Sequence, residues 1–297
     1  MVRLLRSVMV MIITFNLPTK WYYINIIKKT IILKLGGSIV TQKNREGVFI
    51  RRKLLSQIAV ELVKVLKVDK NIRLIIIHGA GAAGHQLANK YGLKSGVNGD
   101  TKKLHGSLLT RIACQNLDLT ITNIFVQNGL PVTPVHTASS VIQNNKIIES
   151  ISYEIIDQVF ASDCVPMMYG EMTFDKTLGM SVCSGDAIAM KLAKKYDATK
   201  IIFASDIDGI YDKDPHTNKD ALLITSTTLK SISSNKDITL SESHNVDVTG
   251  GLANKIAELI AGDLPKSLRK VIVCNGLKPN ILSAAFTDQE KGTVINI

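Results

Sequence analysis

The stretch Ile-Ile-Leu-Lys-Leu-Gly-Gly-Ser at residues 31–38 decides the fold, because it joins an apolar run to a pair of glycines. Such a run is typical of a buried β-strand, and open α/β sheets bind ligands where their parallel strands end. The pattern returns at residues 74–85, LIIIHGAGAAGH, where a helical pattern follows the glycines. We therefore expect two strands of one sheet, each ending in a turn that lets the backbone approach a ligand closely.

Similar apolar runs recur along the chain and alternate with helical patterns, as in residues 54–66. This alternation predicts a three-layered α/β fold with a largely parallel, buried sheet. Residues 141–150, VIQNNKIIES, place two asparagines between apolar flanks and predict a β-hairpin. The expected strands are residues 31–35, 74–77, 131–135, 165–169, 200–204 and 271–275.

The 297 residues carry a formal net charge of +11, but residues 1–30 contribute several bases and no acid. The rest has no basic run interleaved with aromatic residues, so we expect no nucleic-acid partner. A modest positive field suits an enzyme that collects anionic substrates. Four scattered cysteines without a CxxC pair or zinc-like spacing predict reduced thiols and a cytoplasmic protein.

Residues 1–29 form an N-terminal extension that is basic and apolar, and Pro18 interrupts it. It is too short and broken for a transmembrane helix, so we expect no stable membrane insertion. It is either an amphiphilic anchor or the result of a start assigned too early, with Met11 as an alternative start. We expect the remaining chain to be one unit with two lobes, residues 30–180 and 181–297, a division that rests on motif content because no linker is visible.

Two glycine turns offer phosphate sites. Lys34 precedes Gly36 and Gly37 and adds a positive charge to a turn whose N–H groups suit phosphate oxygens, although a plain turn is the alternative. This motif is neither a Walker A loop nor GxGxxG. His85 stands in the first turn of the helix after the second glycine turn, where the helix dipole favours an anion. His85 either contacts a phosphate or caps the helix.

Three later motifs add acids and a lysine. Asp186 either orients active-site lysines or, with Ser184, caps the helix that follows. Residues 206–211, DIDGIY, form a loop after a strand that could hold a ribose, a base edge or nothing. Residues 247–251, DVTGG, enter a helix containing Lys255 and suit the β- and γ-phosphates. With no evident nucleophilic triad, the combination favours phosphoryl transfer over hydrolysis.

The ordered motifs KLGGS, HGAGxxGH, YGE, SGD, DIDGIY and DVTGG in residues 31–297 resemble the amino acid kinase superfamily. HGAGxxGH with its final His85 resembles the isopentenyl phosphate kinase branch. The resemblance implies an open αβα sandwich with a mainly parallel sheet, an acceptor lobe followed by an ATP lobe, and a homodimer. It also implies phosphorylation of isopentenyl phosphate in the alternate mevalonate pathway, with ATP and Mg²⁺ as cofactors and magnesium arriving on ATP rather than on protein ligands.

The same resemblance implies the roles of individual residues. Catalysis falls to Lys34, Lys43, His85, Asp186 and Lys255. ATP binding falls to Lys34, Leu35, Gly36, Gly37, Ser38, Gly81, Asp206, Tyr211, Gly251 and Lys255. Acceptor binding falls to Ala80, Gly84, His85 and Gly170. We expect in-line transfer, in which an oxygen of the acceptor phosphate attacks the γ-phosphorus without a covalent enzyme intermediate or a strong general base.

Two residues depart from the family pattern, and both concern the acceptor pocket. Ala83 stands where relatives often carry phenylalanine, and Glu171 stands where aspartate is common. The alternatives are a fosfomycin-type or other small phosphate or phosphonate kinase of the same fold, and a non-catalytic nucleotide-binding protein. Lys34, Lys43, Asp186 and Lys255 together argue against the latter, because a binder needs no lysine for the transition state.

Overall fold

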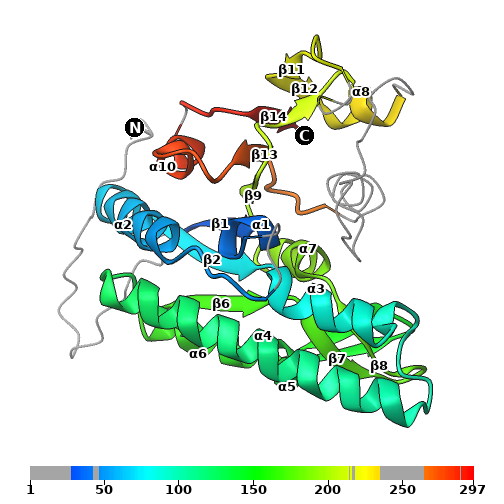
Figure 1. Cartoon of the computed structure of the whole chain (residues 1–297). Coiled ribbons are helices and arrows are strands. Elements are labelled where there is room, and N and C mark those ends of the chain that lie inside the picture. The colour runs from blue at the N-terminus through cyan, green and yellow to red at the C-terminus, as the bar shows by residue number, and fades with distance from the viewer. Residues whose placement is uncertain (1–27, 43–46, 214, 216–217, 235–263, 288) are drawn as a thin grey trace, which may run out of the picture.

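The computed structural model describes residues 28–42, 47–213, 215, 218–234, 264–287 and 289–297 (Figure 1). The predicted roles of Lys43, Gly251 and Lys255, and the expectations for residues 1–27, lie outside the described residues. The first strand, β1 (Lys29–Leu35), begins one residue before the predicted start of the kinase region.

An eight-stranded sheet forms the centre of the molecule, in the order β12-β14-β13-β9-β1-β2-β6-β3. All six predicted strands belong to it, and β1 runs parallel to both of its neighbours. One pair, β13 and β14, is antiparallel, so the prediction of a mainly parallel sheet is confirmed. The other strands are β2 (Ile72–His78), β3 (Val132–Pro134), β6 (Val165–Tyr169), β9 (Lys200–Ser205), β12 (Ser226–Thr228), β13 (Lys270–Asn275) and β14 (Thr293–Asn296).

Helices cover both faces of this sheet, which confirms the three layers (Figure 1). Successive side chains of a strand point to opposite faces, and Leu33 accordingly packs in one core while Ile32 packs in the other. The Leu33 face is covered by α2 (Arg52–Val68), α4 (Thr101–Gln127) and α10 (Ile281–Phe286). The Ile32 face is covered by α6 (Tyr153–Ala161) and α7 (Gly185–Lys195).

A second sheet of four strands, in the order β5-β4-β7-β8, projects beyond the end of β6. It contains the predicted hairpin, β4 (Val141–Asn144) and β5 (Ile147–Ile151), whose turn residues Asn145 and Lys146 both have positive φ. A second hairpin that the sequence did not reveal, β7 (Glu171–Asp175) and β8 (Gly179–Cys183), completes it. The small strands β10 (Ile210–Tyr211) and β11 (Leu223–Ile224) pair separately.

Short helices begin at the ends of several strands and lead into the loops. They are α1 (Gly37–Val40), α3 (Gly81–Lys90), the 3₁₀ helix η1 (Leu93–Ser95), α5 (Thr137–Ser140) and α8 (Leu229–Ser234). In the described part of the chain, no helix has the length and apolar character needed to cross a membrane.

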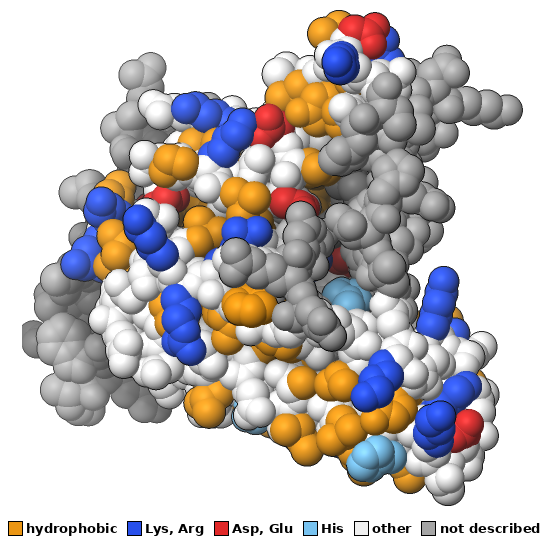
Figure 2. All heavy atoms as spheres, in the orientation of Figure 1, with side chains coloured by type: hydrophobic (Ala, Val, Ile, Leu, Met, Phe, Trp, Pro, Cys, Tyr) orange, Lys and Arg blue, Asp and Glu red, His pale blue; other side chains and the backbone are white. Residues whose placement is uncertain are grey.

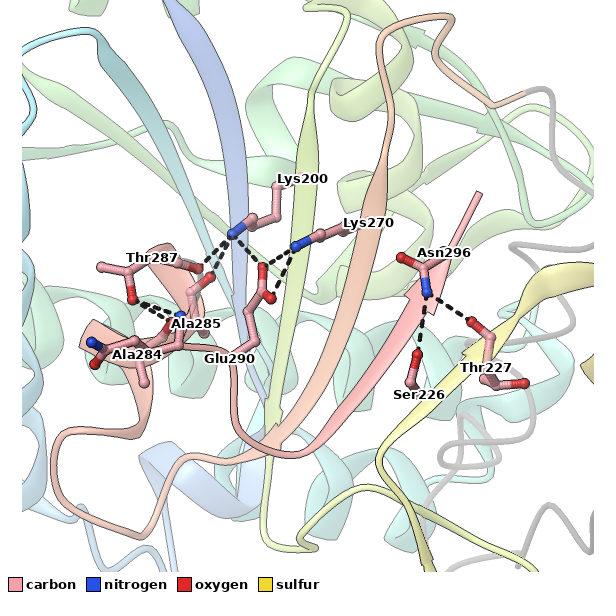
Figure 3. A network of polar contacts seen from close by, with 10 residues as sticks. Lys200, Ser226, Thr227, Lys270, Ala284, Ala285, Thr287, Glu290 and Asn296 are labelled. Carbon is pink, nitrogen blue, oxygen red and sulfur yellow. Dashed lines mark hydrogen bonds and ion pairs between the residues drawn. The ribbon is translucent and has the colours of Figure 1, made fainter.

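The last strand is held to the sheet by polar contacts (Figure 3). The Glu290 carboxylate accepts hydrogen bonds from the Lys200 and Lys270 ammonium groups, at 3.1 and 2.9 Å from its Oε1. At the other end, Asn296 contacts Ser226 and Thr227 of β12. The C-terminal segment thereby ties together three strands of the main sheet.

Candidate active site

Two glycine turns pack against each other at the carboxyl ends of β1 and β2. A Cβ atom on Gly79 would lie 2.7 Å from the Gly37 nitrogen, and one on Gly37 would lie 2.9 Å from the Gly81 Cα. Real Cβ atoms do not approach backbone so closely, so side chains at these positions would push the turns apart. Because β1 and β2 are parallel neighbours, both turns lie at the same edge of the sheet.

Thr41 joins the helices that begin at these turns, a role that sequence reasoning missed. Its hydroxyl donates to the Gly37 carbonyl at 3.0 Å and accepts from the Ala82 N–H at 2.9 Å. Gly81 has φ +53, and a Cβ there would meet the same hydroxyl. The starts of α1 and α3, whose first N–H groups have no intrahelical partner, are therefore fixed side by side. This arrangement suits the oxygens of a phosphate.

Lys34 and Asp186 form a buried ion pair beside the turns. The Lys34 Nζ lies 2.8 Å from the Asp186 Oδ1, and both side chains are about nine-tenths buried. Lys34 comes from β1, and Asp186 comes from the first turn of α7. Ser184 caps α7, because its Oγ accepts from the Asp186 N–H at 3.1 Å. The two interpretations of the SGD motif are thus shared between its residues, with Ser184 capping and Asp186 pairing with lysine.

The residues expected to bind the acceptor surround the start of α3. Gly170 donates its N–H to the His78 carbonyl at 3.1 Å, and a Cβ on Gly170 would lie 3.1 Å from the Gly185 nitrogen. Gly170 therefore lies between the end of β2 and the start of α7. His85 is half-buried and is the fifth residue of α3, just past the first turn in which the sequence prediction placed it. The structure thus gathers Ala80, His85 and Gly170 at one end of the sheet.

Gly84 has a packing role that the motif did not indicate. A Cβ there would lie 2.5 Å from the Ala80 Cβ and 3.0 Å from the Cys114 Sγ on α4. Close packing of α3 on α4 therefore requires glycine at this position. Burial raises the pKa of the Cys114 thiol far above its usual range, so this cysteine behaves as an apolar packing residue.

The expected nucleotide side follows β9. Asp206 is exposed directly after the strand, and Tyr211 is half-buried in β10. Sequence reasoning gave no role to Asp208, which accepts from the Asn275 amide at 2.9 Å and pairs with the Lys278 ammonium at 2.7 Å. These two contacts hold the pKa of Asp208 below its usual value. Asp208 thereby links the loop after β9 to the loop after β13.

Within the residues that the structure describes, no group of three His, Cys, Asp or Glu side chains is arranged to hold a metal ion. The polar groups gathered at the strand ends are instead one buried lysine, its carboxylate partner and the N–H groups of two helix starts. Such groups bind and position phosphates.

Known proteins share both the sequence and this architecture. An isopentenyl phosphate kinase of Methanocaldococcus jannaschii is 31% identical over 278 residues, which cover 89% of this chain and 98% of the relative. An isopentenyl phosphate kinase of Methanothermobacter thermautotrophicus is 29% identical over 271 residues, with the same coverage. A solved structure, described as an X-ray structure of isopentenyl phosphate kinase, matches 90% of this chain and all of its own, with a TM-score of 0.74 and 26% identity.

The family model described as "Amino acid kinase family" matches residues 29–261, a range that contains both glycine turns, Lys34 and Asp186. The described part of that range has the three layers and the glycine turns that the resemblance implied. On these grounds the chain belongs to the amino acid kinase family.

Proposed function

We propose that this protein is an ATP-dependent kinase that converts isopentenyl phosphate to isopentenyl diphosphate. One observation carries the proposal: the buried Lys34 of β1 lies between two strands. One of these strands leads to the residues expected to bind the acceptor, and the other leads to a residue expected to bind ATP. In the sheet, Lys34 is level with Ile77 of β2 and Phe203 of β9. The strand β2 leads to Ala80 and His85, and β9 leads to Asp206. A cation at this boundary suits a phosphoryl group that passes from one side to the other.

The acceptor is inferred from the relatives. Both archaeal relatives are named isopentenyl phosphate kinases, and each aligns over almost its whole length. The two-lobe division at residue 180 follows the same logic, with the acceptor lobe containing β2 and β6 and the nucleotide lobe containing α7 and β9. As the product of this reaction is an isoprenoid precursor, we place the enzyme in isoprenoid biosynthesis.

The chemistry proposed is direct transfer. An oxygen of the acceptor phosphate forms a bond to the γ-phosphorus, the bond between that phosphorus and the β–γ bridging oxygen breaks, and ADP leaves. An acceptor phosphate is already anionic near neutral pH, so positioning and charge neutralisation carry the reaction. We propose that Lys34 and its partner Asp186 do this work, and that His85 contacts the acceptor phosphate. The roles of Lys43 and Lys255 stay predictions.

ATP suits the described site because the two glycine turns have no room for side chains where they meet, and such turns at helix starts let the backbone approach phosphates closely. Magnesium, carried by ATP, would add charge neutralisation on the phosphates. We propose a cytoplasmic protein, which agrees with the four cysteines, all of them free thiols.

We also propose a homodimer that forms through α4. Five large apolar side chains are exposed on this helix, at a spacing that places them on one face. Figure 2 shows hydrophobic side chains gathered along α4. An exposed apolar stripe of this length is typical of a protein interface, and a second copy presents the same surface. The residues of this α4 stripe are Leu104, Leu108, Ile112, Leu119 and Val126.

The test is phosphate transfer from Mg-ATP to isopentenyl phosphate, dimethylallyl phosphate, fosfomycin, UMP and glutamate, with the wild type and His85→Ala. We expect isopentenyl phosphate to be the preferred acceptor and its turnover to collapse in the variant. If fosfomycin were the preferred acceptor, the proposed substrate would be wrong, whereas the proposed phosphoryl-transfer chemistry would stand. ATP binding without transfer to any acceptor would favour a non-catalytic nucleotide-binding protein.

A further inference from the structure

A layer of buried polar side chains lies beneath the acceptor end of the sheet, and the proposed reaction does not use it. His78 ends β2 and Tyr169 ends β6, and the two residues are paired in register. Their rings stack with centroids 5.1 Å apart, and neither residue is exposed to solvent. Because the next residues are Gly79 and Gly170, this stacked pair supports both loops that carry the expected acceptor contacts.

The helix α4 adds a carboxylate to the layer. The His78 Nε2 lies 3.2 Å from the Asp118 Oδ1, and the His78 Nδ1 lies 3.0 Å from the Gly79 carbonyl oxygen. The imidazole ring of His78 thus lies between the Asp118 carboxylate on α4 and the carbonyl of its own glycine turn.

Glu171 is the remaining acid of the layer. Its Oε1 accepts from the Ala138 N–H at 2.8 Å, while the Arg111 Nε lies 3.9 Å from its Oε2, beyond hydrogen-bond distance. In the described part of the structure, this Oε2 and the Asp118 Oδ2 are both buried without a hydrogen-bond partner.

Each neighbouring element presents a group to Glu171. Burial is the main cause that raises the pKa of Glu171 to about 7; Asp118 on α4 adds to the rise, and the Ala138 N–H on α5 and Arg111 on α4 oppose it. The Tyr169 hydroxyl, from β6, also lowers this pKa. That hydroxyl is 2.8 Å from the Nδ1 of the exposed His136, which connects the layer to solvent.

We propose that Glu171 is a positioning residue of the acceptor site, and that its protonation state sets how tightly the acceptor phosphate binds. The inference rests on the proposed function. When Glu171 is protonated, it adds no charge beneath the Gly170 loop, whose N–H donates to the His78 carbonyl of β2. When Glu171 is ionised, a buried negative charge stands one residue from Gly170 and repels the acceptor phosphate. The KM for the acceptor should therefore rise with pH, whereas kcat should not.

The test compares kcat and the KM for the acceptor from pH 5.5 to 8.5 in the full-length wild type and in Glu171→Gln. The acceptor phosphate itself ionises in this range, but it does so equally for both proteins. We expect the wild-type KM to rise roughly three- to tenfold more than that of the variant, which is the order of effect expected of one partly screened charge. Glu149→Gln, an exposed change in the same small sheet, should follow the wild type.

A second variant tests the same inference without removing the carboxylate. Arg111→Gln takes away the cation that stabilises ionised Glu171, so the midpoint of the KM change should move to higher pH. Parallel KM profiles for the wild type and Glu171→Gln, together with an unmoved midpoint in Arg111→Gln, would overturn the inference. Those results can be obtained with any acceptor that is turned over, so they are distinct from a failure of isopentenyl phosphate as the substrate.

Discussion

Lys34 is a charged residue inside the central strand of a sheet, and only 6% of it is exposed. A buried ammonium is costly unless a carboxylate compensates it, and Asp186 does so at 2.8 Å. The pair also fixes the position of Nζ before substrate arrives. In a reaction that depends on charge neutralisation, such preorganisation lowers the reaction barrier. It does so without strengthening the binding of one substrate.

Replacing Asp186 by Asn should leave Lys34 in place but poorly oriented. We expect kcat to fall roughly 10²–10³-fold, the loss typical of one well-placed electrostatic group, with a smaller effect on the KM for ATP. Steady-state kinetics with saturating acceptor measure this, and circular dichroism checks the fold. A variant with unchanged kcat would show that Asp186 serves only the stability of α7.

At the scale of residues, the sequence indicates which polar residues matter when they stand in glycine motifs. It does not indicate those whose partners lie far along the chain. Lys34, Ser184 and Asp186 can be singled out from the sequence because each stands near a strand end or a helix start, where a polar residue has few structural roles. Thr41 and Asp208 cannot, because short polar side chains are common and their partners, Ala82 and Asn275, lie far along the chain. The role of Gly84 in acceptor binding stays a prediction, and the structure adds a packing role that its motif does not indicate.

Asp175 shows how one buried carboxylate organises an element. It accepts from the N–H groups of Asn145 and Lys146 in one hairpin turn and from those of Thr177 and Leu178 in the other. The Ser181 hydroxyl also donates to it, at 2.7 Å. Burial alone would raise the pKa of Asp175, but these hydrogen bonds outweigh it and hold the pKa at about 2.

Asp175→Asn should destabilise the four-stranded sheet, because the new amide places a donor where Lys146 and Ser181 donate. The folded pKa lies below the usual value of 3.8, so the ionised carboxylate stabilises the fold above pH 3.8, and this contribution is lost as the pH falls towards 2. We expect a loss of about 2 kcal/mol at pH 7, measured by urea unfolding. The difference in unfolding free energy between the variant and the wild type should be smaller at pH 3.5 than at pH 7.

The exposed Asp163, which lies two residues after the end of α6, provides the matched control for this prediction. Asp163→Asn changes the same functional group without a buried partner, so its unfolding midpoint should equal that of the wild type. Equal midpoints for Asp175→Asn and the wild type at pH 7 would contradict the role assigned to Asp175.

Glu290 anchors the C-terminal segment between two lysines, as Figure 3 shows. Glu290→Gln keeps the shape but leaves Lys200 and Lys270 without their negative partner. We expect a loss of roughly 1–3 kcal/mol in unfolding free energy at pH 7, because hydrogen bonds between charged groups are involved. Since the Glu290 and Lys200 side chains are largely buried, added salt should reduce this difference only slightly. A difference abolished by moderate salt would mark the contact as a surface ion pair.

Among the elements, the strands of the main sheet could be predicted because they are buried on both faces and therefore read as continuous apolar runs. The strand β14 has only four residues, and its pairing with β13 and β12 comes from distant segments. The hairpin of β7 and β8 belongs to the small sheet and lacks an Asn-Gly or Asp-Gly turn. Neither β14 nor this hairpin therefore gives a strong strand signal in the sequence alone.

At the scale of the whole molecule, a single copy of the chain leaves the apolar α4 stripe exposed to solvent. The residues Leu108, Ile112 and Leu119 of the α4 stripe are each exposed by 45% or more. Placing a charge in the middle of such a stripe opposes burial against a second copy. The proposed dimer can therefore be tested without touching the strand ends.

Ile112→Glu should give a monomer in light scattering coupled to size exclusion, whereas the wild type should elute as a dimer. The control is Val68→Glu on α2, where 88% of the valine is exposed outside the stripe, and which should stay dimeric. A wild type that is monomeric at micromolar concentration, or an Ile112→Glu dimer, would reject this interface.

The position of β1 in the sheet also governs when the protein becomes able to bind during its synthesis. The partner strand β9 lies far along the chain, and the Gly36 N–H is held by the Ala204 carbonyl at 2.8 Å. While only the first half of the chain has left the ribosome, β1 is an apolar edge strand, open to pairing with other chains. The turn that begins with Gly36 reaches its final shape only after β9 arrives, so an unfinished chain forms the proposed acceptor side first and the Gly36 turn last.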